Sequence, residues 1–261
     1  MDLDRHIRRL AEHSRQHLIG TPDYDYHIQL KLEHSLRVLD NAREIVEGDG
    51  ITGRTRDLTL LAALYHDIGR FTQYARYRTY NDRESANHAR LGVLALRTPG
   101  FIDHLPAADQ RLIRAAIGLH NVKTLPSSLP EPLNTAARIV RDSDKLDIFP
   151  VMITHLGGDK PLDPVVVLGA TQHPTRYTQS ILQDVLAGRT GSYSEIRWSN
   201  DFKMLVAGWI NDFNTETGLD LLARSGNMEK LLALLPDIPE IIKLKHRILN
   251  QLHYKMPSSP C

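Results

Sequence analysis

The chain has 261 residues, 41% hydrophobic and 24% charged, as in an ordinary globular protein with a substantial core. Its 32 basic and 31 acidic residues give a net charge of +1, which is no strong signal for nucleic-acid or membrane binding. No apolar run approaches the roughly 20 residues of a membrane span, and the charged N-terminus lacks a signal-peptide segment. The single cysteine, Cys261, allows no internal disulfide and no thiolate metal site, so we expect a reducing, cytoplasmic location.

Apolar residues recur at spacings of three and four along most of the chain, which predicts an all-α fold. Residues 159–179 contain a short β-like run near prolines, and the tail KMPSSPC is expected to fray. Asn134 is the expected cap of a helix that begins with the residues TAARIVRDSDKLDIF. The other predicted helices cover residues 4–18, 27–46, 55–67, 86–97, 107–119, 181–186, 201–217, 219–235 and 238–253.

The chain contains no convincing linker, so the pattern favours a helical bundle with a C-terminal helical extension. We expect an N-terminal helix in residues 1–24, a core domain in residues 25–150, and an extension packed on that core in residues 151–261.

The segment LYHDIGRF, residues 64–71, places a histidine and an aspartate at the end of an apolar helix. Burying a charge without a partner is expensive, so another part of the chain should compensate it. Four further polar residues fall on the apolar stripe of a predicted helix, and His34, for example, shares its face with Val38 and Ala42. The six inward groups are His34, His66, Asp67, His88, His120 and Asp144.

Each of these residues also has an ordinary explanation. A single inward histidine is more often a hydrogen-bonded core residue, Asp144 could pair with an arginine, and His120 could cap a helix C-terminus. Six groups on five helices would each need a separate partner, whereas one or two metal ions would compensate all of them. Imidazole and carboxylate ligands without thiolates suit divalent iron, manganese, zinc, nickel or magnesium. The remaining histidines are assigned to ordinary packing: His6, His13, His17, His27, His104, His155, His173, His246 and His253.

The order H…HD…D, carried here by His34, His66, Asp67 and Asp144, resembles the HD superfamily of metal-dependent phosphohydrolases. HDIG at residues 66–69 is the central motif, and the resemblance covers roughly residues 25–150. Within DSDKLD, Asp144 matches the family aspartate because it directly precedes Lys145 and Leu146.

His88 and His120 resemble the extra histidines of the dinuclear branch, which includes HD-GYP phosphodiesterases and HD-type diiron oxygenases. No GYP follows the motif, so cyclic-dinucleotide hydrolysis is not supported. Arg70 stands where many HDIG proteins have lysine. The substitution keeps the positive charge but replaces a compact ammonium by a planar, forked guanidinium.

The chemistry expected of such a site is hydrolysis by a metal-activated hydroxide. Asp67 has two oxygens beside His66 and is the natural bridge between two ions. Lys145 is the first candidate for binding phosphate because the superfamily's nucleotide hydrolases have a lysine there, and Arg70 is the second, with a surface salt bridge as its alternative. The tyrosine- and arginine-rich segment 71–83 could stack a base and attract phosphate, or could simply be a partly packed surface connection.

The resemblance leaves three functions open. The preferred one is a phosphohydrolase acting on a nucleotide or another small phosphoester, with homo-oligomer formation left open. The alternatives are an HD-type diiron oxygenase and a metal-binding, nucleotide-sensing protein without turnover.

Overall fold

The computed structural model describes residues 1–158 and 161–255. The described residues form helices joined by turns, without a strand, and the all-α prediction is confirmed. An isolated parallel bridge between Thr171 and Trp198 is the β-type pairing that they contain.

The chain divides into two compact units, Met1–Asp147 and Ile148–Cys261, and the helix α7 runs through the boundary. The domain limits expected at residues 24/25 and 150/151 stay predictions. The helices that begin in the first unit are α1 (Leu3–Arg15), α2 (Pro22–Gly48), α3 (Gly53–Tyr65), α4 (Gly69–Tyr77), α5 (His88–Ala95), α6 (Ala107–Leu119) and α7 (Leu133–Leu156).

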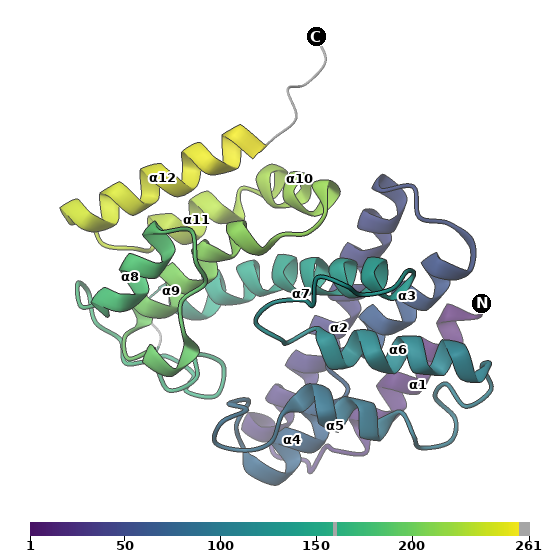
Figure 1. Ribbon diagram of the computed structural model, residues 1–261. Helices are drawn as coiled ribbons and strands as arrows, with labels where there is room; N and C mark the ends of the chain where they lie inside the picture. The colour runs from purple at the N-terminus through teal and green to yellow at the C-terminus, as the bar shows by residue number, and fades with distance from the viewer. Residues whose placement is uncertain (159–160, 256–261) are drawn as a thin grey trace. The chain divides into compact units, whose positions relative to one another are not determined.

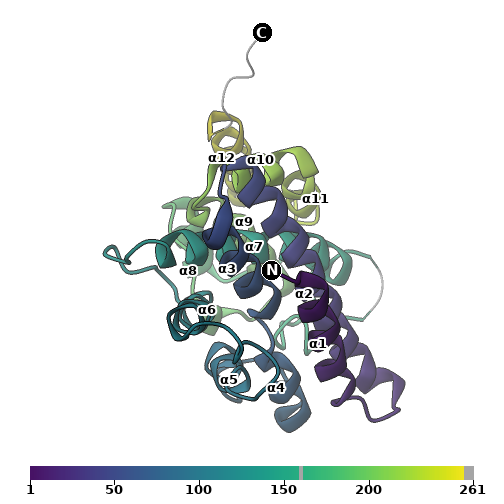
Figure 2. The same ribbon diagram turned by 90° about the vertical axis from the view of Figure 1, so that its right-hand side faces the viewer.

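Helix α3 is the central helix of the first unit. It packs against both α2 and α6, while α5 packs against α4 and α6 (Figures 1 and 2). Every residue from Leu58 to Tyr65 is buried, so α3 has no solvent-facing stripe over its last two turns. The residues that follow its end, His66 and Asp67, therefore enter the interior of the unit.

Gly69 allows two helices to approach closely at this point. A Cβ at Gly69 would overlap the carbonyl oxygen of His88 and the backbone nitrogen of Gly92, both on α5. Only a residue without a side chain fits between these backbones. The glycine of HDIG therefore begins α4 and holds it against α5, whereas the sequence suggested that it simply ends a helix.

Two further boundaries differ from the prediction in the first half. Residues 71–77, which were expected to belong to a connection, are part of α4. Helix α7 continues through Pro150 to Leu156, although the pattern loosens after that proline. Proline removes one backbone hydrogen bond from a helix interior, and the remaining bonds of a long helix can carry it.

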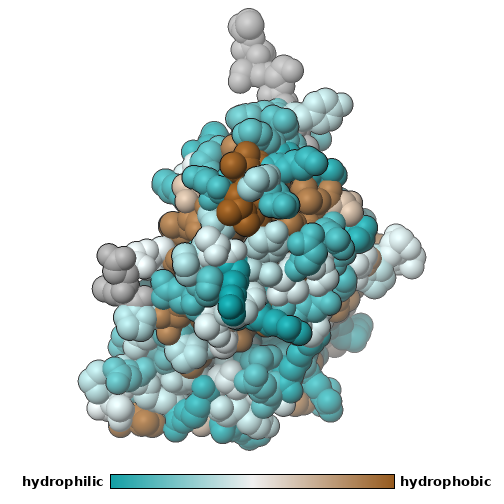
Figure 3. All heavy atoms as spheres, turned by 90° about the vertical axis from the view of Figure 1, so that its left-hand side faces the viewer, coloured by the Kyte–Doolittle hydropathy of each residue, from teal (hydrophilic) through white to brown (hydrophobic). Residues whose placement is uncertain are grey.

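The second unit is also helical. Beyond α7 it contains α8 (Gln179–Leu186), α9 (Ser199–Gly208), α10 (Glu216–Ser225), α11 (Asn227–Ala233) and α12 (Pro239–Lys255), with short 3₁₀ turns at Tyr193–Glu195 and Trp209–Asp212. On the face drawn in Figure 3, most of the surface is hydrophilic or neutral, and hydrophobic side chains gather in its upper part. Among the described residues, no helix combines the length and the apolar character needed to cross a membrane.

Three predictions for this unit were wrong in detail. The helix expected over residues 201–217 stops at Gly208. The Asn211 side chain donates to the Gly208 carbonyl at 3.1 Å and so competes with the backbone N–H groups of the helix for this acceptor. The helix expected over residues 219–235 breaks at Gly226, which has φ +64° and separates α10 from α11.

The β-like run forms turns, because the Asp163 carboxylate accepts the backbone N–H of Val165 at 3.0 Å. Of the tail predicted to fray, residues 256–261 lie outside the described residues.

Candidate metal centre

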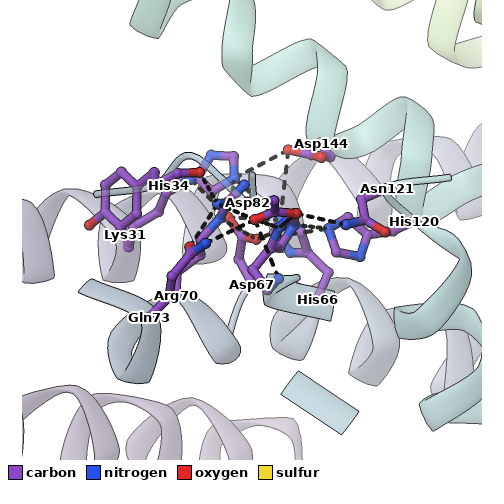
Figure 4. A network of polar contacts seen from close by, with 12 residues as sticks. Lys31, His34, His66, Asp67, Arg70, Gln73, Asp82, His120, Asn121 and Asp144 are labelled. Carbon is purple, nitrogen blue, oxygen red and sulfur yellow. Dashed lines mark hydrogen bonds and ion pairs between the residues drawn. The ribbon is translucent and has the colours of Figure 1, made fainter. Parts of the chain in front are cut away.

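All six predicted ligands meet inside the first unit. They come from the middle of α2, the α3–α4 turn, the start of α5, the end of α6 and the middle of α7 (Figure 4). Their ligand atoms form two groups that could each hold a metal ion. One group is His34, His66 and Asp144, and the other is Asp67, His88 and His120.

In the first group, the ligand atoms of His66 and Asp144 lie close to the Nε2 atom of His34. The Nε2 atom of His34 lies 3.2 Å from Nε2 of His66 and 3.2 Å from Oδ1 of Asp144. His34 and His66 are buried, whereas Asp144 remains partly accessible at 25% of its side chain. The open side of this group is therefore the side of Asp144.

The second group is tighter, and Asp67 joins it to the first. The Nε2 atoms of His88 and His120 are 2.9 Å apart. Asp67 directs Oδ1 at these two nitrogens, at 3.4 and 3.8 Å, and Oδ2 at His34 Nε2 and His66 Nε2, at 3.5 and 3.7 Å. One carboxylate therefore presents one oxygen to each group.

The outer nitrogens of all four rings are held by acceptors. His34 Nδ1 is 2.7 Å from Asp147, and His88 Nδ1 is 2.7 Å from Asp82. The Nδ1 atoms of the other two rings face backbone carbonyls, that of Ala63 at 2.8 Å for His66 and that of Ile117 at 2.7 Å for His120. An Nδ1 that faces a carbonyl or carboxylate carries the proton, so each neutral ring directs its Nε2 lone pair into the centre.

In the second group, the surroundings favour neutral histidine rings beside an ionised Asp67. Burial, followed by the neighbouring His88 and His66, lowers the pKa of His120 to about 3. Burial and then Arg70 lower the pKa of His88, although Asp82 and Asp67 oppose them. Burial would raise the pKa of Asp67, but the cations around it, Lys31 foremost, hold that pKa well below its usual value.

The first group has a different balance. Burial alone would lower the pKa of His66, but Asp67 and Asp144 raise it above the ordinary value. Burial would raise the pKa of Asp144, whereas its contacts with His34 and His66 hold it well below the usual range. The two aspartates are therefore anionic at neutral pH, as metal ligands must be.

Two cations contact Asp67 directly. Lys31 Nζ donates to Oδ2 at 2.8 Å, and Arg70 Nε donates to Oδ1 at 3.3 Å (Figure 4). The Nη1 atom of Arg70 also donates to Gln73 at 2.8 Å and to the Tyr80 carbonyl at 2.7 Å. Arg70 is thus fixed among protein acceptors. This arrangement resembles the salt bridge named as its alternative role more than it resembles a side chain available to phosphate.

The other two predictions near the site are placed as follows. Lys145 is buried, and its ion pair with Asp142 spans 3.8 Å, so its phosphate-binding role stays a prediction. In segment 71–83, Phe71, Tyr74 and Tyr80 are buried while Tyr77 is 44% exposed. Three of its four aromatic rings are therefore packed inside the unit, as in a partly packed surface connection.

Several polar residues of the site were not found from the sequence. Lys31 and Asp147 lie three residues from His34 and Asp144 on the same helices, and that spacing was a usable signal. Asp82 accepts from Gln73 at 2.9 Å and from Asn121 at 3.2 Å in addition to His88. Nothing local in the sequence marks Asp82, because its partners come from three different elements.

The donor set fits divalent cations on structural grounds. Two neutral imidazoles whose Nε2 atoms lie 2.9 Å apart direct their lone pairs at each other, and a cation between or beside them relieves this repulsion. Each of the four rings also has the outer acceptor typical of histidine ligands.

Comparison with known proteins matches part of this chain to a family model and to two relatives. The family model described as "HD domain" matches residues 32–148. A bifunctional uridylyltransferase/uridylyl-removing enzyme of Pseudomonas syringae pv. syringae is 29% identical over 153 residues, which cover 52% of this chain and 16% of the relative. The enzyme of the same name from P. syringae pv. tomato is 27% identical over 153 residues, with the same coverage of both chains.

The chain therefore spans about a sixth of the length of these relatives. No solved structure gives a significant match. The match, the helical fold and the clustered histidines and aspartates together identify residues 32–148 of this chain as an HD domain.

Proposed function

We propose that this protein is a metal-dependent phosphohydrolase that acts on a nucleotide or another small phosphoester. The observation that carries the proposal is Asp67, whose two oxygens face two separate groups of ring nitrogens. His34, His66 and Asp144 would hold one ion, His88 and His120 would hold the other, and Asp67 would be shared. Bound divalent ions would supply a hydroxide nucleophile near neutral pH and positive charge for phosphate oxygens.

The chain's own residues prepare the site for that chemistry. The neutral rings of His88 and His120 need not lose a proton before they bind a cation, because the pKa of His120 is about 3 and that of His88 is lowered. Lys31 and Arg70 keep Asp67 ionised and fix its orientation. The outer carboxylates of Asp82 and Asp147 hold His88 and His34.

The comparisons support hydrolysis in general terms only. HD domains belong to a superfamily of metal-dependent phosphohydrolases, and the printed name of the relatives includes removal of a uridylyl group. A uridylyl group is attached through phosphate, so a uridylyl ester belongs among the substrates to be tested. The cytoplasmic location and the homo-oligomer stay predictions.

The test is reconstitution of metal-stripped protein with iron, manganese, nickel, zinc or magnesium, followed by assays of phosphomonoesters, phosphodiesters and nucleotides. Asp67→Ala should abolish turnover, while Asp40→Ala is the matched control because that carboxylate is 63% exposed and pairs with Arg43. Running each assay with and without O₂ separates hydrolysis from the oxygenase alternative. Turnover that survives in Asp67→Ala would refute the proposal.

A further inference from the structure

Lys31 occupies a position that the six ligands do not explain. It lies on α2, three residues before His34, so the same face of the helix presents both side chains to the centre. Its Nζ donates to Asp67 Oδ2 at 2.8 Å, and its side chain is 12% exposed. Figure 4 draws Lys31 and Arg70 on the same side of the cluster, away from His120.

The environment of Lys31 leaves donor capacity for a ligand. An ammonium group has three N–H donors, and within the described residues the structure gives Lys31 a single hydrogen-bond acceptor, Asp67. Its Nζ also lies 5.2 Å from the centre of the Tyr80 ring, and the Tyr80 hydroxyl donates to the His27 carbonyl at 2.7 Å. The ring is thus anchored and steers the ammonium toward Asp67.

The two arginines near the centre are held by protein acceptors. Arg70 donates to Asp67, Gln73, the Tyr80 carbonyl and Asp82. Arg37 donates to Asp147 at 2.6 Å and lies 43% exposed behind His34. Each guanidinium is held in place by several bonds to protein acceptors, whereas the Lys31 ammonium is held by one and can direct its other N–H donors at a ligand while it keeps Asp67.

We propose that Lys31 is a phosphate-binding residue of this site, and that it donates to a non-bridging oxygen of a phosphoester held beside Asp67. This inference rests on the proposed function for its substrate class. The ammonium suits this role because it acts as a compact charge and can hold Asp67 and phosphate at once. Because Lys31 contacts Oδ2 of Asp67, the bound phosphate would lie on that side of the carboxylate, next to the group formed by His34, His66 and Asp144.

The test compares Lys31→Met and Lys31→Arg with Lys243→Met, which changes an exposed lysine of α12. For each metal-reconstituted protein, calorimetry with inorganic phosphate gives the anion affinity, metal analysis gives the metal content, and kinetics with the best phosphoester gives kcat and KM. Lys31→Met should keep its metal, bind phosphate roughly tenfold or more weakly and raise KM similarly, since one charge-assisted hydrogen bond is lost. Lys31→Arg should recover part of the affinity, and Lys243→Met should match the wild type.

The outcomes separate this inference from the proposed function. Unchanged phosphate affinity in a metal-loaded Lys31→Met protein overturns the role of Lys31, even if the wild type is an active hydrolase. Loss of metal from Lys31→Met also overturns it, because weaker phosphate binding would then follow from the lost ion, and holding Asp67 would be the whole role of the ammonium. If the wild type hydrolyses no phosphoester but binds phosphate through Lys31, the proposed function fails and the binding role stands.

Discussion

The Nε2 atoms of His88 and His120 face each other at 2.9 Å although each ring has its other nitrogen occupied by an acceptor. With both rings neutral, this arrangement brings two lone pairs together at the end of α6 and the start of α5. A folded protein retains such repulsion only where another group relieves it, and a cation is the group that two imidazoles and a carboxylate oxygen favour.

This relationship predicts two metal positions that can be emptied separately. Changing His88 and His120 together to alanine should lower the metal content from about two ions per chain to about one, because the ligands of the other group remain. Elemental analysis of reconstituted protein measures the content. The mirror variant, His34→Ala with His66→Ala, should also leave about one ion. A wild type that binds a single ion, unchanged in the His88/His120 double variant, would refute the dinuclear prediction.

The outer carboxylates predict a second, graded effect. Asp82→Asn should weaken metal binding mainly at the His88 and His120 position, since Asp82 orients His88 at 2.7 Å. Asp147→Asn should act mainly at the other position through His34, also at 2.7 Å. Losses of roughly 10- to 100-fold in metal affinity are expected for such partners.

Titration of metal-free protein with zinc or manganese would measure both affinities. Glu44→Gln, on the same helix as His34, is a suitable control because this side chain is exposed to solvent. Equal loss at both positions in Asp82→Asn would contradict separate control of the two positions.

The close approach at Gly69 predicts a large effect of a single methyl group. Gly69→Ala should destabilise the fold by several kcal/mol or prevent folding, because the Cβ would overlap the backbone of α5 at His88 and Gly92. Gly118→Ala is the matched control, since a Cβ there meets only a Val93 methyl at 4.0 Å. That change should be neutral or stabilising by up to about 1 kcal/mol, because alanine favours a helix more than glycine does. Urea unfolding measures both, and a Gly69→Ala protein as stable as the wild type would refute the backbone contact.

The six candidate ligands could be predicted because helical periodicity reports which residues point inward, and motif order reports which of them belong together. The same periodicity could not show that residues 69–77 form a helix, since their packing depends on the contact of Gly69 with α5, which is distant in sequence. Asp82 was missed for the same reason, because its partners His88, Gln73 and Asn121 meet only in the folded unit. Local pattern predicted which polar residues meet in the interior, while the residues that hold them in place depend on tertiary contacts.

The break of the predicted helix 201–217 illustrates a second limit. Its apolar spacing continues past Gly208, but the Asn211 side chain binds the Gly208 carbonyl and ends the regular hydrogen bonding. Whether a side chain competes with the helix backbone depends on the local geometry within about one turn. The spacing of apolar residues carries no information about that geometry.

The last prediction concerns His13 and the pH dependence of stability. This residue lies on α1 against the rings of Phe71 and Phe101, and its buried Nε2 has no hydrogen-bond partner among the described residues. Burial, followed by the nearby His17 and Arg9, lowers its pKa to about 4. In the unfolded chain a histidine titrates near about 6.5.

Between pH 6.5 and 4 the unfolded chain therefore binds a proton at His13 that the folded chain does not bind. Stability from the neutral ring is fully present above the unfolded pKa and is lost as the pH falls toward the folded one. His13→Leu removes both this titration and an unpaired polar atom. Its free energy of unfolding should equal or exceed that of the wild type at neutral pH, and the advantage should grow by about 1 kcal/mol on acidification to mildly acidic pH.

Urea unfolding of metal-free protein at neutral and mildly acidic pH measures this difference directly. Other groups with lowered pKa, such as His6, titrate in both proteins and cancel in the comparison. His246→Leu, which changes an exposed ring of α12, should leave the pH dependence of the wild type unaltered. If His13→Leu loses stability on acidification as steeply as the wild type, then His13 is protonated in the folded protein and its burial does not oppose the charge.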